Sequence, residues 1–178
     1  MDVELTTLRL RLRPRRRTDA PAFIAGLNDW EVVRWLTVVP YPFTVADLDD
    51  WMARQQPPVP GNGHFSIDLP GAGMIGVVSL DEHLGYWLAR AHHGKGYMTE
   101  ACIGLLDWHF TARPDDLVLS SYHVGNDASA TVQRKLGFVV TGERRMLFVR
   151  SQQHEVEHIG TSLARAQFEA ATRQGGAA

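Results

Sequence analysis

The amino-acid sequence predicts a mixed α+β fold, in which helices cover the faces of a sheet. Several short segments alternate hydrophobic and polar residues with the two-residue period of strands, and others have the apolar spacing of helices. Their order is strand, helices, several strands, helix, strand, helix and two strands, which alternates too little for a doubly wound parallel sheet. We therefore expect one domain over residues 1–178, with a poorly ordered tail from about residue 170.

The first half of the chain predicts one strand, three helical segments and a hairpin. Residues 5–13 predict a half-buried strand, in which leucines and arginines alternate over 8–13. The arginines form a solvated strand face or, as the alternative, a phosphate-binding stripe. Thr18 or Asp19 is placed to cap a first helix, a second helical segment covers residues 31–36, and Thr44 precedes a third, "VADLDDWMARQQ". The segments "HFSIDL" and "MIGVVSL" flank "PGAG" and predict the hairpin.

The second half predicts two helices between further strands. Residues 84–89 are typical of a strand and 97–112 of a helix, in which Cys102 belongs to the apolar face. "DLVLSSYHV" predicts another strand, and "NDASATVQRKLG" predicts a short helix with Asn126 as its N-cap and Gly137 as its C-cap. "FVVTG" and "EVEHIGTSL" predict the last two strands.

The composition excludes several classes of protein. Hydrophobic residues make up 44% of the chain and charged residues 21%, as in globular rather than disordered proteins. No apolar run approaches the roughly 18 residues needed to cross a bilayer. A net charge of −2 gives no general attraction for nucleic acid. A single cysteine cannot form an internal disulfide, so we expect a cytoplasmic protein that binds neither membranes nor nucleic acid.

Two glycines stand between the strand at 84–89 and the helix that follows, in "LARAHHGKGYMTEACIGLLDWHF". Glycine permits a positive φ, and the N–H groups at a helix start form an anion site. A P-loop requires a hydroxyl residue after Lys95, where this chain has Gly96. A dinucleotide fingerprint requires a third glycine, where this chain has Thr99. The loop therefore fits neither nucleotide-binding motif.

The stretch "GYWLARAHHGKGYMTEA" resembles the acetyl-CoA loop of GNAT-type N-acetyltransferases, especially their ribosomal-protein branch of the RimJ/RimL type. The loop pattern is Gln/Arg-x-x-Gly-x-Gly/Ala, which Gly96 matches and from which His93 and Met98 depart. Further segments are similar to the branch, namely "TTLRLRLRPRRRTDAPAF", "YPFTVADLDDWM" and "NDASATVQRKLGF". These matches keep their order from residue 5 to about 168, which is nearly the whole chain.

The resemblance implies a GNAT fold, with a central, mostly antiparallel mixed sheet of about seven strands, a splay between its two central parallel strands, and about four flanking helices. It implies direct transfer of an acetyl group from acetyl-CoA to a primary amine, without a metal, by a monomer or homodimer. The acceptor amine is a small molecule or a protein N-terminus. By resemblance the residues that bind acetyl-CoA are Tyr86, Trp87 and Leu88 beside the pantetheine, then His93, Gly94, Lys95, Gly96, Tyr97, Met98 and Thr99 at the phosphates, and Asn126 and Ser129 in the next helix.

Acetyl transfer requires one group that takes the proton of the amine and another that stabilises the leaving thiolate. Many family members place a tyrosine seven residues after the capping asparagine, where this chain has Gln133. The branch resemblance instead implies that Ser129 donates a hydrogen bond to the thiolate. For the base it implies the position of His83, with the adjacent Glu82 as the alternative. An imidazole ordinarily titrates near pH 6.5, which suits this task, although "DEH" is also typical of a surface turn.

Trp30, Trp35 and Tyr41 are expected to line the acceptor cleft, because of their position in the family. Two other functions stay open. One is a CoA-binding module of the same fold that has no catalytic activity. The other is a zinc hydrolase, because "HEVEH" at residues 154–158 matches His-Glu-x-x-His. That motif binds zinc only when it lies on a helix, whereas the apolar residues around it favour a strand.

Overall fold

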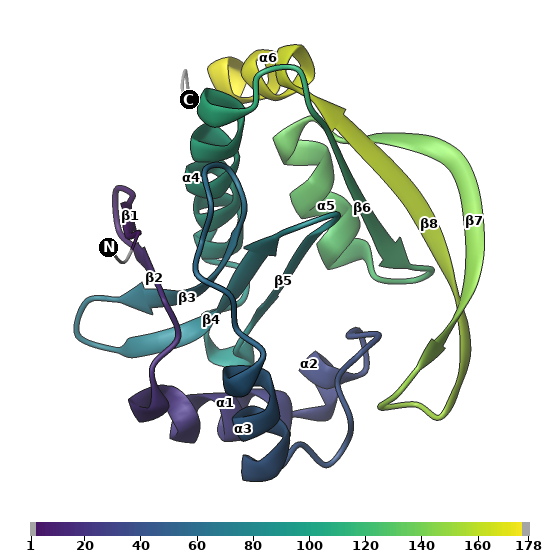
Figure 1. Ribbon diagram of the computed structural model, residues 1–178. Coiled ribbons are helices and arrows are strands. Elements are labelled where there is room, and N and C mark those ends of the chain that lie inside the picture. The colour runs from purple at the N-terminus through teal and green to yellow at the C-terminus, as the bar shows by residue number, and fades with distance from the viewer. Residues whose placement is uncertain (1–2, 176–178) are drawn as a thin grey trace.

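The computed structural model describes residues 3–175, which form eight strands and six α-helices (Figure 1). In chain order these are β1 (Leu5–Thr6), β2 (Arg11–Arg13), α1 (Ala20–Leu27), α2 (Trp30–Val33), α3 (Val45–Ala53), β3 (Gly63–Leu69), β4 (Gly73–Leu80), β5 (Leu84–Leu88), α4 (Tyr97–Ala112), β6 (Leu117–His123), α5 (Asp127–Leu136), β7 (Val139–Val149), β8 (His154–Ala164) and α6 (Arg165–Gly175). The mixed α+β class is confirmed.

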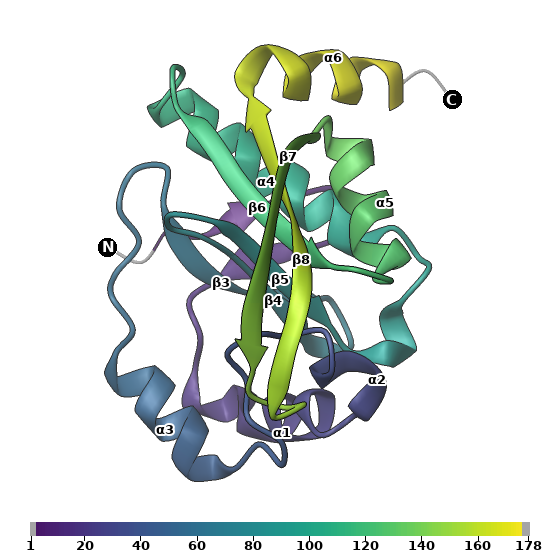
Figure 2. The same ribbon diagram turned by 90° about the vertical axis from the view of Figure 1, so that its right-hand side faces the viewer.

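The strands form two antiparallel sheets that meet at one parallel bridge. Five strands pair in the order β1-β2-β3-β4-β5, and three pair in the order β6-β8-β7, in which Figure 1 shows β8 between its two neighbours. Figure 2 shows β7 and β8 in front of β4 and β5. His83, just before β5, bridges in parallel to Leu119 of β6, and Ser120 Oγ donates to Leu84 O at 2.8 Å. Beyond this point β5 and β6 diverge (Figure 1). The predicted splay between two central parallel strands is therefore present, with the mostly antiparallel pairing that was expected.

Two apolar layers lie on the two faces of the five-stranded sheet. One face packs against α4, whose inward residues Ala101, Cys102 and Leu105 are fully buried, as the apolar spacing of this helix predicts. The other face packs against α1, α2 and α3. Side chains alternate along β5, so that Tyr86 packs on the α4 side while Trp87 contacts the α1 side. The strand that borders the splay is thus held from both faces.

The predicted caps of α3 and α5 are present, whereas the one predicted for α1 is not. Thr44 and Asp47 form a reciprocal capping box at the start of α3. Asn126 Oδ1 accepts a hydrogen bond from Ser129 N at 3.1 Å. Gly137 ends α5 with φ of +92°, and a side chain there would meet Gln167 O at 2.6 Å. Helix α5 is therefore fixed at both ends by local chemistry.

Residues 5–13 do not form the single strand that their alternation predicts. Thr7 N donates to Leu10 O at 2.9 Å, and this turn folds β1 back on β2 as a short hairpin. Nor do all the arginines face solvent, because Arg13 is 4% exposed and its guanidinium contacts Asp19 and Asp68 at 2.8 and 2.9 Å. Asp19 precedes α1, but its carboxylate binds Arg13 instead of capping the helix. A two-residue period predicts which side chains share one face of a strand. It does not predict whether a charged side chain on that face meets solvent or a buried partner of opposite charge.

The tail also differs from expectation. Helix α6 continues to Gly175, past the point near residue 170 where poor order was expected, and Phe168 in its first half is buried. Residues 176–178, the last part of the expected tail, lie outside the described residues. Within residues 3–175 no helix combines the length and the apolar character that crossing a membrane requires.

Candidate functional site

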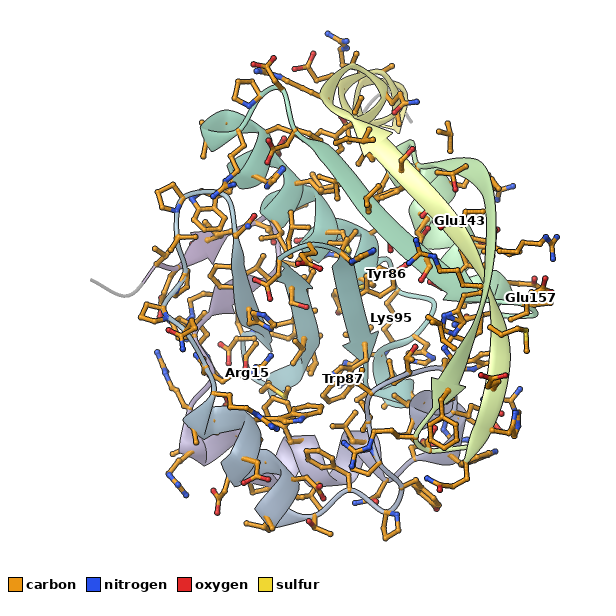
Figure 3. All side chains as sticks on the ribbon, turned by 45° about the vertical axis from the view of Figure 1, so that its right-hand side comes forward. Arg15, Tyr86, Trp87, Lys95, Glu143 and Glu157 are labelled. Atoms are coloured by element: carbon orange, nitrogen blue, oxygen red, sulfur yellow. The ribbon has the colours of Figure 1, made fainter. Side chains whose placement is uncertain are left out.

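A cleft of about 1620 Å³ opens along the splay between β5 and β6. Strand β5, the loop before α4 and the start of α5 line one side, and residues of β6, β7 and β8 line the other (Figure 3). Most of the site residues expected from the sequence meet here, namely His83, Tyr86, Trp87, Leu88, His93, Gly94, Gly96, Tyr97, Met98, Thr99, Asn126, Ser129 and Trp35.

The loop before α4 presents its main chain to the cleft. Gly94 and Gly96 have φ of +72° and +80°, the left-handed region that glycine adopts without strain. Gly96 is the N-cap of α4 and has no side chain that caps the helix, so the N–H groups of Tyr97, Met98 and Thr99 face outward from its first turn. This arrangement is an anion site at the positive end of a 16-residue helix, and it fits a pyrophosphate.

The charged side chain beside this loop is Arg9, whereas the sequence predicted Lys95 at this position. Lys95 does not line the cleft, because its Nζ donates to Ala91 O at 2.9 Å. Arg9 takes the place beside the loop: its Nη1 donates to Lys95 O at 3.1 Å and its guanidinium lies 4.5 Å from the centre of the Tyr97 ring. Glu100 fixes this arginine through an ion pair of 2.7 Å. Arg9 was expected on a solvated strand face, with a phosphate-binding stripe as the alternative, and no local signal in its surroundings relates it to residue 95.

Strand β5 directs main-chain groups into the splay. Ala89 N donates to Ile75 O of β4 at 2.9 Å, and the alternation of an antiparallel pair then turns the main-chain groups of Leu84, Tyr86 and Leu88 away from β4. His93 Nε2 donates to Leu88 O, the last carbonyl of β5, at 2.7 Å. His93, which stands where the family loop has glutamine or arginine, therefore binds the end of this strand. The N–H and C=O of Tyr86 are left facing the gap, where an amide-containing chain can pair with them.

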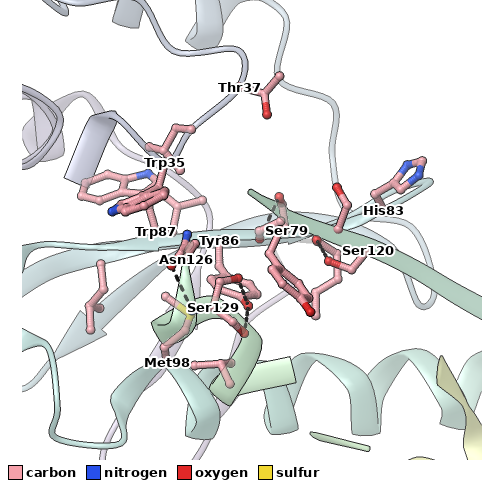
Figure 4. A pocket seen from close by; sticks show the side chains of 18 of the residues that line it. Trp35, Thr37, Ser79, His83, Tyr86, Trp87, Met98, Ser120, Asn126 and Ser129 are labelled. Atoms are coloured by element: carbon pink, nitrogen blue, oxygen red, sulfur yellow. Dashed lines mark hydrogen bonds between the residues drawn. The ribbon is translucent and has the colours of Figure 1, made fainter. Parts of the chain in front are cut away.

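Ser129 and Tyr86 bring two hydroxyls together where β5 meets α5 (Figure 4). The two oxygens are 2.8 Å apart, and the Tyr86 hydroxyl is also 3.3 Å from Ser129 O. Burial raises the pKa of Tyr86 well above its ordinary value, so this phenol stays protonated and keeps a hydrogen to donate. The N-cap bond to Asn126 fixes the main chain of Ser129. The sequence indicated Ser129 but did not indicate its contact with Tyr86.

Gln133 is part of the framework of the splay. It is 2% exposed, its Nε2 donates to Ser120 Oγ at 3.0 Å, and Thr161 Oγ1 donates to its Oε1 at 2.7 Å. Since Ser120 Oγ in turn donates to Leu84 O, this network joins β5, β6, α5 and β8 at the closed end of the gap. An amide suits this position because it donates and accepts at once.

The remaining expected residues separate into two groups. His83 lines the cleft, whereas Glu82 does not, and both residues are exposed in the bend before β5. Trp35 lines the cleft, but Trp30 and Tyr41 do not: their rings pack edge to face, 5.4 Å apart, on the outer surface. These two aromatic residues therefore do not line this cleft, unlike Trp35. Helix α2 has only one turn, and its side chains point in different directions.

The cleft also contains titratable side chains that the sequence did not single out for it. His123 of β6 and His158 of β8 lie on opposite strands of one registered pair and stack on each other. His64 Nε2 bonds to Asp81 Oδ2, and Arg15 Nη2 lies 3.0 Å from His64 Nδ1. No sequence pattern relates these residues, since sheet register alone brings them together.

Residues 154–158 lie on strand β8, as their apolar neighbours predict. Four residues of strand separate His154 from His158 by about 13 Å, too far for both to bind one zinc ion. Among residues 3–175, no group of three or more histidine, cysteine or acidic side chains is placed to hold a metal ion.

The chain is similar to known acetyltransferases. The acetyltransferase (GNAT) domain family matches residues 9–139. The chain is 33% identical over 90 residues to a Bacillus subtilis (strain 168) protein named "Putative ribosomal N-acetyltransferase YdaF". That alignment spans 47% of this chain and 49% of the relative, so the chain matches about half of that protein's length.

Solved structures share the fold over nearly the whole chain. RimJ of Mycobacterium smegmatis, in complex with CoA-disulfide, superposes with a TM-score of 0.73 at 22% identity, covering 99% of this chain and 93% of that one. The ribosomal-protein-S5-alanine acetyltransferase of Vibrio fischeri superposes with a TM-score of 0.67 at 23% identity, covering 94% and 99%. At this level of identity the likeness shows a common fold.

Proposed function

The chain belongs to the GNAT acetyltransferase family, and on this basis we propose that it transfers an acetyl group from acetyl-CoA to a primary amine. The observation that carries the proposal is the start of α4. Its first N–H groups, opened by Gly94 and Gly96, lie in the same cleft as the outward main chain of β5. The first feature suits a pyrophosphate and the second an amide-rich pantetheine arm, so together they suit acetyl-CoA.

In this proposal the amine nitrogen attacks the thioester carbon, a C–N bond forms, and the C–S bond breaks to release CoA. Ser129 donates a hydrogen bond to the departing sulfur, and Tyr86 holds the Ser129 hydroxyl from 2.8 Å. His83, which lines the cleft, takes the proton that the amine loses, directly or through water. Positioning of the amine against the thioester supplies the rest of the acceleration.

We infer that the acceptor is the N-terminal amine of a protein or peptide. Support comes from the names of the YdaF relative and the Vibrio fischeri neighbour, both of which refer to ribosomal acetylation. The cleft is also long enough to admit several residues of an extended peptide beside acetyl-CoA, at about 1620 Å³. A cytoplasmic monomer or homodimer is the form in which we expect the protein to act.

The experiment measures thiol release from acetyl-CoA with a panel of amines, and identifies acetylated products by mass. The panel contains hexapeptides with free N-termini, amino acids and polyamines. Gly96→Glu places a carboxylate at the helix start and is expected to lose acetyl-CoA binding in calorimetry. Gly71→Glu is the matched control, because Gly71 has a similar φ of +84° in the β3–β4 turn with open space around it.

Equal acetyl-CoA affinity in the two glutamate variants would contradict the loop assignment. Tight acetyl-CoA binding by the wild type without turnover of any amine would instead identify a CoA-binding module, which is the second function that the sequence left open.

A further inference from the structure

Two buried imidazoles stack on each other in one wall of the cleft, at the end of β6. The rings of His123 and His158 are stacked, with centres 4.1 Å apart and planes at 27°. Each residue is 3% exposed, and both line the cleft. Trp35 packs its edge against His123 at 6.0 Å between ring centres, and Thr37 Oγ1 lies 3.4 Å from His123 Nε2. Trp35 and Thr37 thus cover the pair from the loop after α2.

Three of the four ring nitrogens have no protein partner. In the part of the chain that the structure describes, three nitrogens make no hydrogen bond: both nitrogens of His158 and Nδ1 of His123. Buried polar groups are nearly always hydrogen-bonded, because losing water without a replacement destabilises the folded state. If the two imidazoles only filled space, apolar rings of similar size would fill it without any loss of folding stability. The nitrogens therefore indicate a ligand that supplies their partners.

The charge state of the pair suits an amine. Burial, together with the neighbouring His158, lowers the pKa of His123 to about 4, and burial also lowers the pKa of His158. The charged group that faces them from β7 is Arg145, registered opposite His158, and this arginine is ion-paired with Glu143. At neutral pH both imidazoles are uncharged, so each offers one lone pair to an N–H donor and does not repel a cation.

The pair lies on the side of the splay opposite Ser129. Along β6, Ser120 points toward α5 and bonds Gln133, so His123 points to the other face by strand alternation. Ser129 and Tyr86 approach from the α5 side. A nucleophile held by the imidazoles would therefore approach the thioester from the face of the splay opposite Ser129.

We propose that His123 and His158 bind the primary amine of the acceptor, as hydrogen-bond acceptors that orient its nitrogen toward the thioester. This inference rests on the proposed function and extends it to the acceptor. The two residues are positioning residues, whereas His83 takes the proton. The acceptor class is an amine with at least two N–H groups, one for each imidazole.

The test replaces His158 with phenylalanine, which keeps an aromatic ring in the stack and removes both nitrogens. KM for the amine that the wild type turns over best is expected to rise about tenfold or more, while KM for acetyl-CoA stays within about twofold. The melting temperature is expected to stay equal or to rise, because two unsatisfied nitrogens leave the interior. His158→Gln, which returns a polar group near the position of Nε2, is expected to recover part of the affinity. His154→Phe, on the exposed end of the same strand, is the matched control.

Unchanged acceptor KM in His158→Phe would overturn the inference, and so would parallel losses of thermal stability and acetyl-CoA affinity. If that variant does not fold, nitrogen NMR of the wild type decides: the imidazole signals of His123 and His158 should move when the amine is added with CoA present, and unmoved signals would refute the contact. A wild type that acetylates no amine in the panel would refute the proposed function itself. A wild type active on amines with His158→Phe unaffected refutes only this inference.

Discussion

Replacing Ser129 with alanine removes one hydroxyl from the cleft and leaves the start of α5 in place. The cap bond to Asn126 comes from the main-chain N–H of residue 129, so alanine retains it. The Tyr86 hydroxyl loses its partner at 2.8 Å but keeps the carbonyl oxygen of residue 129 at 3.3 Å. Folding stability should therefore fall by only about 0.5–1.5 kcal/mol, as for one neutral hydrogen bond.

The effect on catalysis should be larger, because the thiolate charge exists only after the C–S bond begins to break. A hydrogen bond to a charged group contributes about 1.5–3 kcal/mol. At about 1.4 kcal/mol for each factor of ten, Ser129→Ala should lower kcat about 10- to 150-fold. The dissociation constant for acetyl-CoA should change little, since the ground-state thioester carries no such charge.

The assay is thiol release with both substrates saturating, beside calorimetry for acetyl-CoA. Tyr86→Phe should lower kcat by less than Ser129→Ala does, because the Tyr86 hydroxyl acts through Ser129. The double variant should lose no more kcat than Ser129→Ala alone. Ser79→Ala is the control: this serine lines the same cleft, and its Oγ donates to Gly85 O at 3.3 Å. An unchanged kcat in Ser129→Ala, or an equal loss in Ser79→Ala, would refute the assignment of Ser129 to the leaving sulfur.

Three further predictions concern protons and the framework. With His83 as the base, His83→Gln should lower kcat while the affinity for acetyl-CoA in calorimetry stays unchanged; the same loss with Glu82→Gln alone would transfer the role to Glu82. Burial opposes ionisation of Asp19, but hydrogen bonds from Arg13 outweigh it and hold the pKa of Asp19 below its ordinary value. The stability that this pair contributes is therefore present above about pH 4 and lost as pH falls further, so urea titrations should show the deficit of Asp19→Asn shrinking in acid, and a constant deficit would contradict this. Gln133→Met should cost about 1–3 kcal/mol in the same titrations, because its buried hydroxyl partners lose their hydrogen bonds; an unaltered unfolding midpoint would show that the network contributes nothing.

Local chemistry along the chain was sufficient to predict much of the fold. The box at Thr44, the cap at Asn126 and the glycine at 137 each depend on residues within a few positions, and the structure has all three. The same holds for the loop at Gly94 and Gly96, whose positive φ follows from glycine at a strand-to-helix turn. The family resemblance then added the splay, which no short segment specifies.

Tertiary structure decided which side chains share the cleft. Leucine and arginine alternate through residues 8–13, yet only tertiary packing places Arg13 between Asp19 and Asp68 in the interior. A hydrogen bond within that segment, from Thr7 to Leu10, breaks the strand where the alternation continues.

The sequence by itself determined helices α1 to α5, the β3–β4 hairpin and the loop that suits a pyrophosphate, because each depends on periodicity or on contacts between near neighbours. It did not predict helix α6. Only the tertiary structure placed Trp30 and Tyr41 outside the cleft and stacked His123 on His158 within it. His123 and His158 are far apart in the chain, and only the register of β6 on β8 brings them opposite each other. Register is set by the burial of whole strand faces, so no local pattern could have predicted that contact.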